Sequence, residues 1–393
     1  MSDEYPREYT SGKAPVAAAD VTSLGAYLES FDGEAGYLDW AAFGPLSPSV
    51  RNDSHADAEL LGTGRAAGLD LVGDNVREAR ELVAQVMAAE PEQVVLQPST
   101  TYGLMQAMYG LAGGVLISRA EFPSLTVSAT RAADSLGSMH VEWLEPQDGF
   151  VTPDLVRAAL TDDTRALAVS LVDFRTGYRA DLSALREVIG DRLLIVDAIQ
   201  GFGVVQADYA AADVVCGNGY KWLRAGRGTG FARFSQRAVD RIAPVLSGFD
   251  GTDGDLPVDA VPAPSGSAQA FTVSGADELA AGRLAIALRE IVGVGIDVIE
   301  AELADRADQI MFHAGRYDIA VVTPHEPERR AGIVALAPAP ADAAALAASL
   351  TNHGITVTVR GGSVRVAPHV GTTADTLRLF GDALAEFAST RVR

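Results

Sequence analysis

Two apolar runs in the middle of the chain each lead to a polar side chain, and this pattern constrains the fold most strongly. The run 193–196 is followed directly by Asp197, and the run 214–216 leads through a short turn to Lys221. Both runs are rich in β-branched residues, which is typical of buried parallel strands. Because the carboxyl ends of neighbouring parallel strands meet at one edge of a sheet, we expect Asp197 and Lys221 to lie close together.

A carboxylate and an amine at neighbouring strand ends are what a pyridoxal phosphate (PLP) site requires. The lysine forms a Schiff base with the cofactor aldehyde, and the acid keeps the pyridine nitrogen protonated so that the ring accepts electrons. We therefore predict PLP as the cofactor and Lys221 and Asp197 as catalytic residues.

Strand and helix patterns alternate over much of the chain. Helical patterns cover 75–89, where Asn75 is a candidate N-cap, 124–136 and 181–189. Such alternation predicts an α/β fold with a mostly parallel, seven-stranded sheet covered by helices on both faces. The candidate strands are 93–97, 115–118, 140–143, 166–171, 192–196, 213–216 and 230–234.

The pattern changes after a segment at 250–269 that is rich in Gly, Pro, Asp and Ser, which predicts a linker. We predict a large PLP-binding domain at 35–265 and a small α+β C-terminal domain at 270–393, with residues 1–34 packed against the small domain. The elements expected in the small domain are helices at 276–293, 295–312 and 373–387 and strands at 319–322, 332–336, 355–360 and 364–367.

Composition excludes several classes of protein. The 393 residues are 48% apolar and 21% charged, as in a soluble globular protein, and the net charge of −21 disfavours nucleic acid or an anionic membrane as a partner. The first residues lack the layout of a secretory signal, and no apolar run is long enough to span a bilayer, so we predict a cytoplasmic protein. The six histidines are scattered, and we expect no metal site.

Three further features suit a PLP site, although each has a plainer alternative. Thr100 and Thr101 follow a strand and open a helix, where hydroxyl and amide groups bind phosphate, but they could also be ordinary capping residues. Phe122 follows another strand and could stack on a pyridine ring or pack in the core. Arg365, in a C-terminal hairpin, could clamp a substrate carboxylate, whereas Arg360 is more typical of a solvated surface arginine.

Two motifs are assigned structural roles. The glycine-rich run 224–230 has the spacing G-x-G-x-G and leads into a strand, which disfavours a nicotinamide dinucleotide site and a dehydrogenase. Cys216 is the only cysteine, so the chain forms no internal disulfide framework, and its apolar neighbours predict a buried structural thiol.

In their order along the chain these elements resemble the class V aminotransferase family of fold-type I PLP enzymes, which includes cysteine desulfurases, selenocysteine lyases and isopenicillin N epimerase-like proteins. The most specific stretch is 194–230. The resemblance implies that Lys221 is the Schiff-base lysine, that Asp197 pairs with the pyridine nitrogen and that Arg365 binds the substrate α-carboxylate. It further implies that the remaining cofactor contacts come from Thr100, Thr101, Phe122, Gln200, Asn218 and Tyr220.

The resemblance also implies a homodimer that acts on the α-carbon amine of an amino-acid-like substrate through an external aldimine, by aminotransferase or C–S lyase chemistry. An epimerase or racemase of the same fold is an alternative. So is a non-catalytic PLP-binding relative, which departures from the family pattern at Gly275 and at Gly371-Thr372 favour. The C-terminal domain has no cysteine, which argues against a persulfide mechanism, and the sequence does not fix the substrate side chain.

Overall fold

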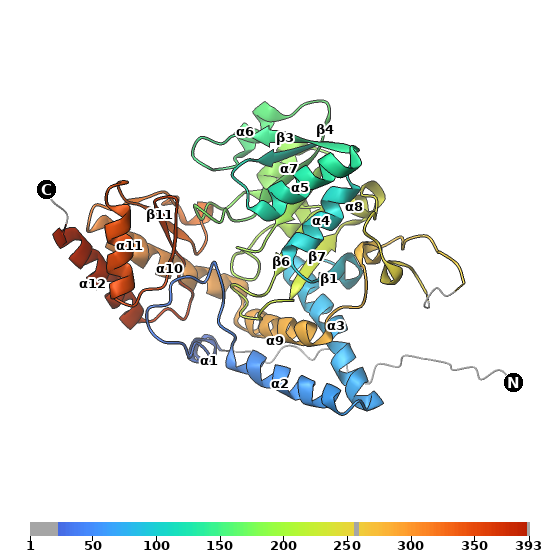
Figure 1. The fold of residues 1–393 in the computed structure, drawn as a ribbon, viewed down its shortest axis with the longest axis horizontal. Helices are drawn as coiled ribbons and strands as arrows, with labels where there is room; N and C mark the ends of the chain where they lie inside the picture. The colour runs from blue at the N-terminus through green and yellow to red at the C-terminus, as the bar shows by residue number, and fades with distance from the viewer. Residues whose placement is uncertain (1–22, 255–258, 391–393) are drawn as a thin grey trace.

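A mostly parallel sheet forms the centre of the larger part of the molecule (Figure 1). Within residues 23–254 and 259–390, which the computed structural model describes, this sheet has seven strands in the order β1-β7-β6-β5-β4-β2-β3, and only β7 runs antiparallel to its neighbours. The strands are β1 (Val94–Gln97), β2 (Gly113–Ser118), β3 (Met139–Leu144), β4 (Thr164–Ser170), β5 (Leu193–Asp197), β6 (Val214–Asn218) and β7 (Gly230–Phe234).

Helices cover both faces of this sheet because successive strand residues point to opposite sides. Leu194 of β5 belongs to the core under one helical layer, and the next residue, Ile195, belongs to the core under the other. The first layer contains α3 (Ala66–Met87), α6 (Pro153–Ala159), α7 (Leu182–Ile189) and α9 (Glu278–Val294), and the second contains α4 (Thr100–Gly110), α5 (Pro123–Leu136) and α8 (Gln236–Arg241).

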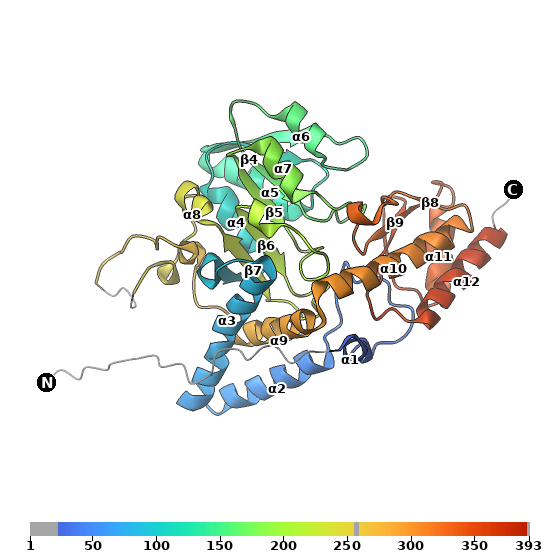
Figure 2. The same ribbon diagram turned by 180° about the vertical axis from the view of Figure 1, so that it is seen from behind.

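The C-terminal part forms a second, smaller unit, seen from the other side in Figure 2. Its antiparallel sheet, in the order β10-β11-β9-β8, packs against helices through a separate apolar core. The elements of this unit are α10 (Ile296–Gly315), β8 (Ala320–Val321), β9 (Val334–Ala337), α11 (Ala343–Asn352), β10 (Thr358–Arg360), β11 (Ser363–Val366) and α12 (Ala374–Thr390).

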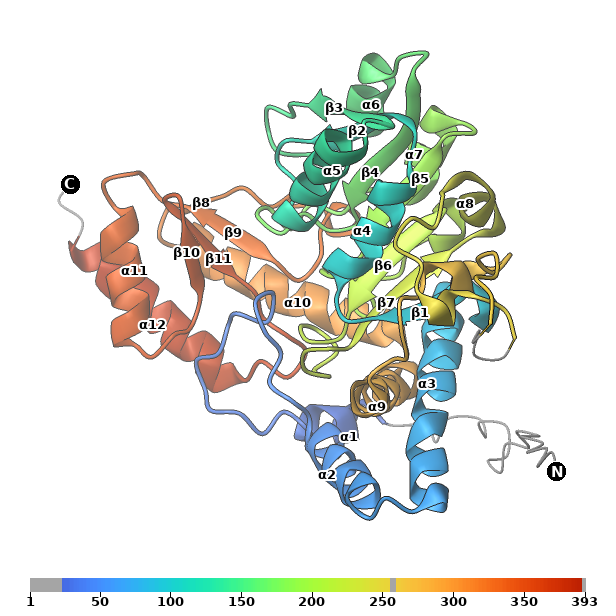
Figure 3. The ribbon, with the colours of Figure 1, turned by 45° about the vertical axis from the view of Figure 1, so that its right-hand side comes forward.

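Within the N-terminal segment, the loop that joins the first two helices runs between the two units, as Figure 3 shows. These helices are α1 (Leu24–Glu29) and α2 (Pro48–Gly62). Between these helices the chain forms isolated bridges from Tyr37 to Thr356 and from Asp39 to Ala367. The segment therefore contacts the C-terminal unit beside β10 and β11, and its helix α1 packs on the larger unit through Tyr27.

The predicted fold class and all the predicted strands are confirmed, whereas five helices were not expected: α1, α2, α6, α8 and α11. The helix predicted at 75–89 begins nine residues earlier, at Ala66, so Asn75 is not its N-cap. Asn75 instead donates a hydrogen bond to Asp57 Oδ2 across the α2–α3 pair (2.8 Å). The predicted packing of residues 1–34 and the predicted linker at 250–269 fall partly on residues 1–22 and 255–258, which lie outside the described residues.

Candidate active site

The ends of the two central strands bring the predicted catalytic pair to one edge of the sheet. Asp197 is the last residue of β5, and β5 pairs in parallel with β6, so that Asp197 lies beside Cys216. Lys221 lies three residues beyond Asn218, at the end of β6. Asp197 and Lys221 are 3% and 6% exposed, and each alters the pKa of the other. The structure therefore brings together the two groups that the sequence pattern predicted.

Burial controls the charge of both groups. Desolvation lowers the pKa of Lys221 to about 8, and the attraction of Asp197 opposes this shift. Desolvation raises the pKa of Asp197 to about 6, against a hydrogen bond from Ile199 N (3.0 Å) and the attraction of Lys221. Near neutral pH the carboxylate is therefore mostly ionised, and a useful fraction of the amine is neutral.

Aromatic rings surround the Lys221 amine. Its Nζ lies 5.7 Å from the centre of the Phe122 ring and 5.5 Å from that of Tyr220. Phe174 packs edge-on against Phe122 and holds its ring in place (5.1 Å between centroids). The amine thus opens onto flat apolar surfaces of the kind that suit an aromatic cofactor.

Gln200 is buried next to the lysine turn. Its Oε1 accepts a hydrogen bond from Trp222 Nε1 (2.9 Å), and its Nε2 donates to Ala41 O (3.1 Å). An amide nitrogen carries two hydrogens, so one donor is left over for the predicted contact with a cofactor oxygen.

The first turn of α4 offers polar groups that suit a phosphate. Ser99 caps the helix by accepting from Tyr102 N, and Thr100 Oγ1 is buried with no hydrogen-bond partner in the described part of the chain. A buried hydroxyl without a partner is costly, so a bound oxygen that pairs with Thr100 would remove this cost. Thr101 differs, because its hydroxyl is hydrogen-bonded to Ser124 Oγ (2.7 Å). The donors here fit the phosphate of PLP.

The other two predicted phosphate contacts lie at the end of β6. Asn218 Oδ1 accepts hydrogen bonds from Thr229 Oγ1 (3.0 Å) and from Tyr220 N (3.2 Å), which fixes the turn that carries Lys221. The Tyr220 ring stands beside the lysine amine, as described above.

Arg365 of β11 reaches the same region from the small unit. Its guanidinium donates to Asp39 Oδ1 (3.2 Å), to Thr358 Oγ1 (3.1 Å) and to Phe174 O (3.2 Å). Arg365 Nε is buried and has no partner among the described residues. The guanidinium is therefore held by one acid and still has an unused donor, as a carboxylate clamp requires.

Three residues that the sequence reasoning did not select hold the lysine turn. His369 Nε2 donates to Trp222 O (2.9 Å), since its Nδ1 accepts from Val370 N. Arg224 has a left-handed backbone (φ 63°) and donates to Ser30 O and Ser30 Oγ. Gly44 N donates to Tyr220 O (2.9 Å). Of these, His369 follows Arg365 in the same motif and Arg224 opens the glycine-rich run 224–230, whereas Gly44 belongs to neither motif.

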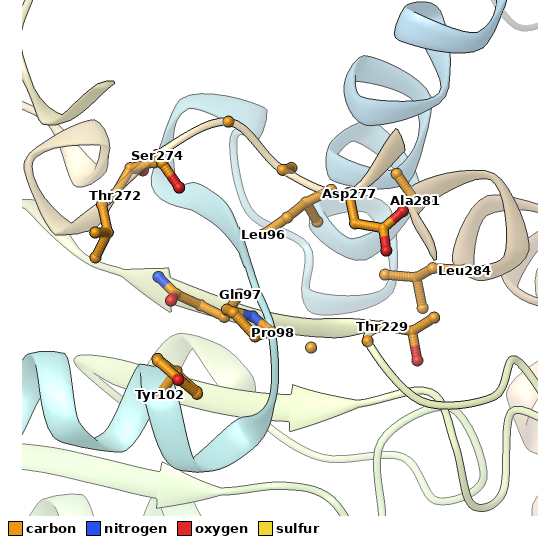
Figure 4. Close-up of a pocket in the computed structure, with 15 residues that line it drawn as sticks. Leu96, Gln97, Pro98, Tyr102, Thr229, Thr272, Ser274, Asp277, Ala281 and Leu284 are labelled. Carbon is orange, nitrogen blue, oxygen red and sulfur yellow. The ribbon is translucent and has the colours of Figure 1, made fainter. Parts of the chain in front are cut away.

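Two cavities border the predicted residues. One of about 400 Å³ lies between the end of β1, the start of β7 and the segment 272–277 (Figure 4). Neither Asp197 nor Lys221 lines it, but Thr229 in its wall contacts Asn218. A second cavity of about 390 Å³, between α4 and α5, is lined by Thr101, Phe122 and Ser124.

The described ranges were found to hold neither a candidate metal cluster nor a candidate membrane span. No group of three or more His, Cys, Asp or Glu side chains there could hold a metal ion. Likewise, no helix in those ranges has the length and apolar character needed to cross a membrane.

The chain is similar to known proteins in sequence and in fold. The chain is 31% identical over 188 residues to the cysteine desulfurase IscS of Ectopseudomonas mendocina, a match that covers 44% of this chain and 46% of the relative. The matched region thus spans about half the length of such curated relatives. The cysteine desulfurase of Thermococcus onnurineus has the same fold, with a TM-score of 0.79 at 21% identity over 90% of this chain and 95% of that one.

A second solved structure, the cystine C–S lyase C-DES in complex with cysteine persulfide, superimposes with a TM-score of 0.80 at 17% identity. That match covers 91% of this chain and 98% of the other. The family model of class V aminotransferases matches residues 70–379. This match includes Asp197, Lys221 and Arg365. The chain therefore belongs to the class V aminotransferase family.

Proposed function

We propose that the protein is a PLP-dependent enzyme that acts on the α-amine of an amino-acid-like substrate, by aminotransferase or C–S lyase chemistry. One observation carries the proposal: in a class V chain, a buried lysine with a lowered pKa lies at a strand end beside a buried carboxylate. The cofactor, when bound, supplies an electron-accepting ring that stabilises negative charge at the substrate α-carbon.

The residues of this chain then have distinct tasks. Lys221 Nζ would hold the cofactor and, once neutral and free, take a proton from the substrate α-carbon. Asp197, ionised near neutral pH, would keep a proton on the ring nitrogen. Arg365 would orient the substrate through its carboxylate while Asp39 fixes the guanidinium. Phe122 and Tyr220 would exclude water from the amine.

The state of the one cysteine favours particular reactions. Cys216 is fully buried, and desolvation raises the pKa of its thiol. A buried neutral thiol is a poor nucleophile, so it does not suit the transfer of sulfur through a protein persulfide. Transamination or direct cleavage of a C–S bond requires no such group, which supports either reaction over a persulfide mechanism. Epimerisation is the runner-up, because it uses the same lysine.

A homodimer and a cytoplasmic location are part of this proposal. The exposed apolar side chains of Tyr102 and Val273, next to the cavity of Figure 4, support a self-associating surface there. Analytical ultracentrifugation tests the dimer.

The direct test is the absorbance of the purified protein after PLP is added. Wild-type protein is expected to acquire a visible band that shifts when amino acids are added one at a time, because the substrate amine displaces Lys221. Lys221→Ala is expected to lose the lysine-dependent band. If wild-type protein takes up no PLP, the proposal is wrong, and if no amine perturbs the bound cofactor, a non-catalytic role is favoured.

A further inference from the structure

The residues predicted to hold the cofactor phosphate lack a positive charge. Thr100, Thr101, Asn218 and Tyr220 are all neutral, and the Thr101 hydroxyl and Asn218 Oδ1 are already engaged within the protein. The dipole of α4 contributes only a fraction of a charge at its N-terminus. A phosphate with nearly two negative charges is bound best where a cation also faces it.

Arg227 is a cation placed next to this set of residues. Its guanidinium carbon lies 4.8 Å from the centre of the Tyr220 ring. Its charge also reaches the lysine, because Arg227 is among the groups that lower the pKa of Lys221. The same guanidinium helps to lower the pKa of Tyr220, although burial raises it more strongly.

The loop that carries Arg227 packs against the N-terminus of α4. Gly226 and Gly228 both have positive φ angles (76° and 86°), which glycine adopts readily. Arg283 Nη2 donates to Arg227 O (2.9 Å) and so holds the loop backbone. At the end of the loop, a Cβ on Gly230 would lie only 2.6 Å from Ser99 N and Cα, so the loop lies directly against the cap of α4.

Arg227 also differs from the other two arginines near the lysine. Arg365 is paired with Asp39, and Arg224 is buried against Ser30. Arg227 forms no ion pair with any residue that the structure describes, and its side chain is exposed. Because Arg365 is assigned to the substrate carboxylate, Arg227 is the exposed guanidinium near the lysine that remains available to a second anion.

We propose that Arg227 binds the phosphate group of the cofactor, together with the first turn of α4. This inference rests on the proposed function. A guanidinium is planar and can donate two parallel hydrogen bonds to phosphate oxygens, and its contact with the Tyr220 ring limits the orientations of the side chain.

The experiment compares PLP with pyridoxal, which lacks the phosphate, by fluorescence titration of the full-length protein. Arg227→Gln is expected to weaken PLP binding on the order of 10- to 100-fold and to leave pyridoxal binding unchanged. Arg227→Lys is expected to fall between, because it keeps the charge and loses the planar fork. The matched control is Arg316→Gln, which removes an exposed guanidinium stacked on Tyr317 after α10.

A second arm adds inorganic phosphate to pyridoxal. Phosphate is expected to increase pyridoxal affinity in wild-type protein and in Arg316→Gln, but not in Arg227→Gln. Equal losses of PLP and pyridoxal affinity in Arg227→Gln would overturn the inference, since Arg227 would then only pack against Tyr220. Unchanged PLP affinity would overturn it as well. If wild-type protein bound neither compound, the proposed function itself would fail, which is a different result.

Discussion

At the scale of single residues, the buried pair of Lys221 and Asp197 combines two opposite requirements. The amine must lose its proton to react, and the carboxylate must keep its charge to stabilise a protonated ring. Burial disfavours the charged form of both groups, while their mutual attraction limits both shifts. With a pKa of about 6 for the acid and about 8 for the amine, the acid is mostly ionised above pH 6, and the neutral fraction of the amine grows as the pH approaches 8.

The pH dependence of cofactor attachment tests this balance. Only the neutral amine attacks an aldehyde, so we expect the rate of PLP attachment to rise about tenfold per pH unit and to level off near the Lys221 pKa of about 8. In Asp197→Asn the levelling point is expected at lower pH, because the carboxylate that favours the charged amine is gone. Stopped-flow absorbance measures both rates, and a midpoint near 10.5 in the wild-type protein would contradict a buried lysine.

At the scale of secondary-structure elements, the strands and their ends could be predicted from sequence, but the turns between them could not. The β-branched runs of β5 and β6 identify strands whose ends carry Asp197 and Asn218, since this pattern depends only on neighbouring residues. The contacts that hold the site join residues far apart in the chain. Asp39 and Arg365 are 326 positions apart in the sequence, and Trp222 and His369 are 147 apart. A local sequence pattern cannot predict contacts between residues so far apart.

His369 links the turn after β11 to the lysine turn through its hydrogen bond to Trp222 O. Because the pKa of His369 is lowered by folding, its contribution to the free energy of unfolding depends on pH. Desolvation lowers the pKa of His369 to about 3, from 6.5 in the unfolded chain. Above pH 6.5 both states are neutral and the contribution of His369 to stability is complete. Below pH 6.5 only the unfolded chain takes up the proton, so this stability is lost as the pH falls toward 3. By pH 5 the loss is about 2 kcal/mol.

We therefore expect His369→Leu to flatten the pH dependence of the free energy of unfolding between pH 5 and 7. At pH 7 it should also cost about 1–3 kcal/mol, because Trp222 O and Val370 N lose their partner. Urea unfolding at both pH values measures these changes. The control His55→Leu removes an exposed histidine of α2 and should keep the wild-type slope. A wild-type slope in His369→Leu would show that other groups set the acid sensitivity.

At the scale of the whole molecule, the segment 37–45 connects the two units at the candidate site. Asp39 pairs with Ala367 in the backbone and with Arg365 through its side chain, so one end of the segment belongs to the small sheet. The other end holds the lysine turn through the hydrogen bond from Gly44 to Tyr220. A shift of this segment would therefore move the lysine and the arginine relative to each other.

Gly44 is the point at which this connection can be disturbed with the smallest change. In Gly44→Ala the new Cβ would lie 1.9 Å from Lys221 O, so the segment and the lysine turn must separate. We expect a loss of about 1–3 kcal/mol in the free energy of unfolding, together with weaker PLP binding. Gly33→Ala, in the loop between α1 and this segment, has nothing within 4 Å of the new Cβ and should stay within about 0.5 kcal/mol of wild type. If the segment positions the lysine turn, displacing it in Gly44→Ala must also displace Lys221 and weaken PLP binding. A Gly44→Ala protein that lost stability but bound PLP as tightly as Gly33→Ala would contradict this, and the segment would then only cover the site.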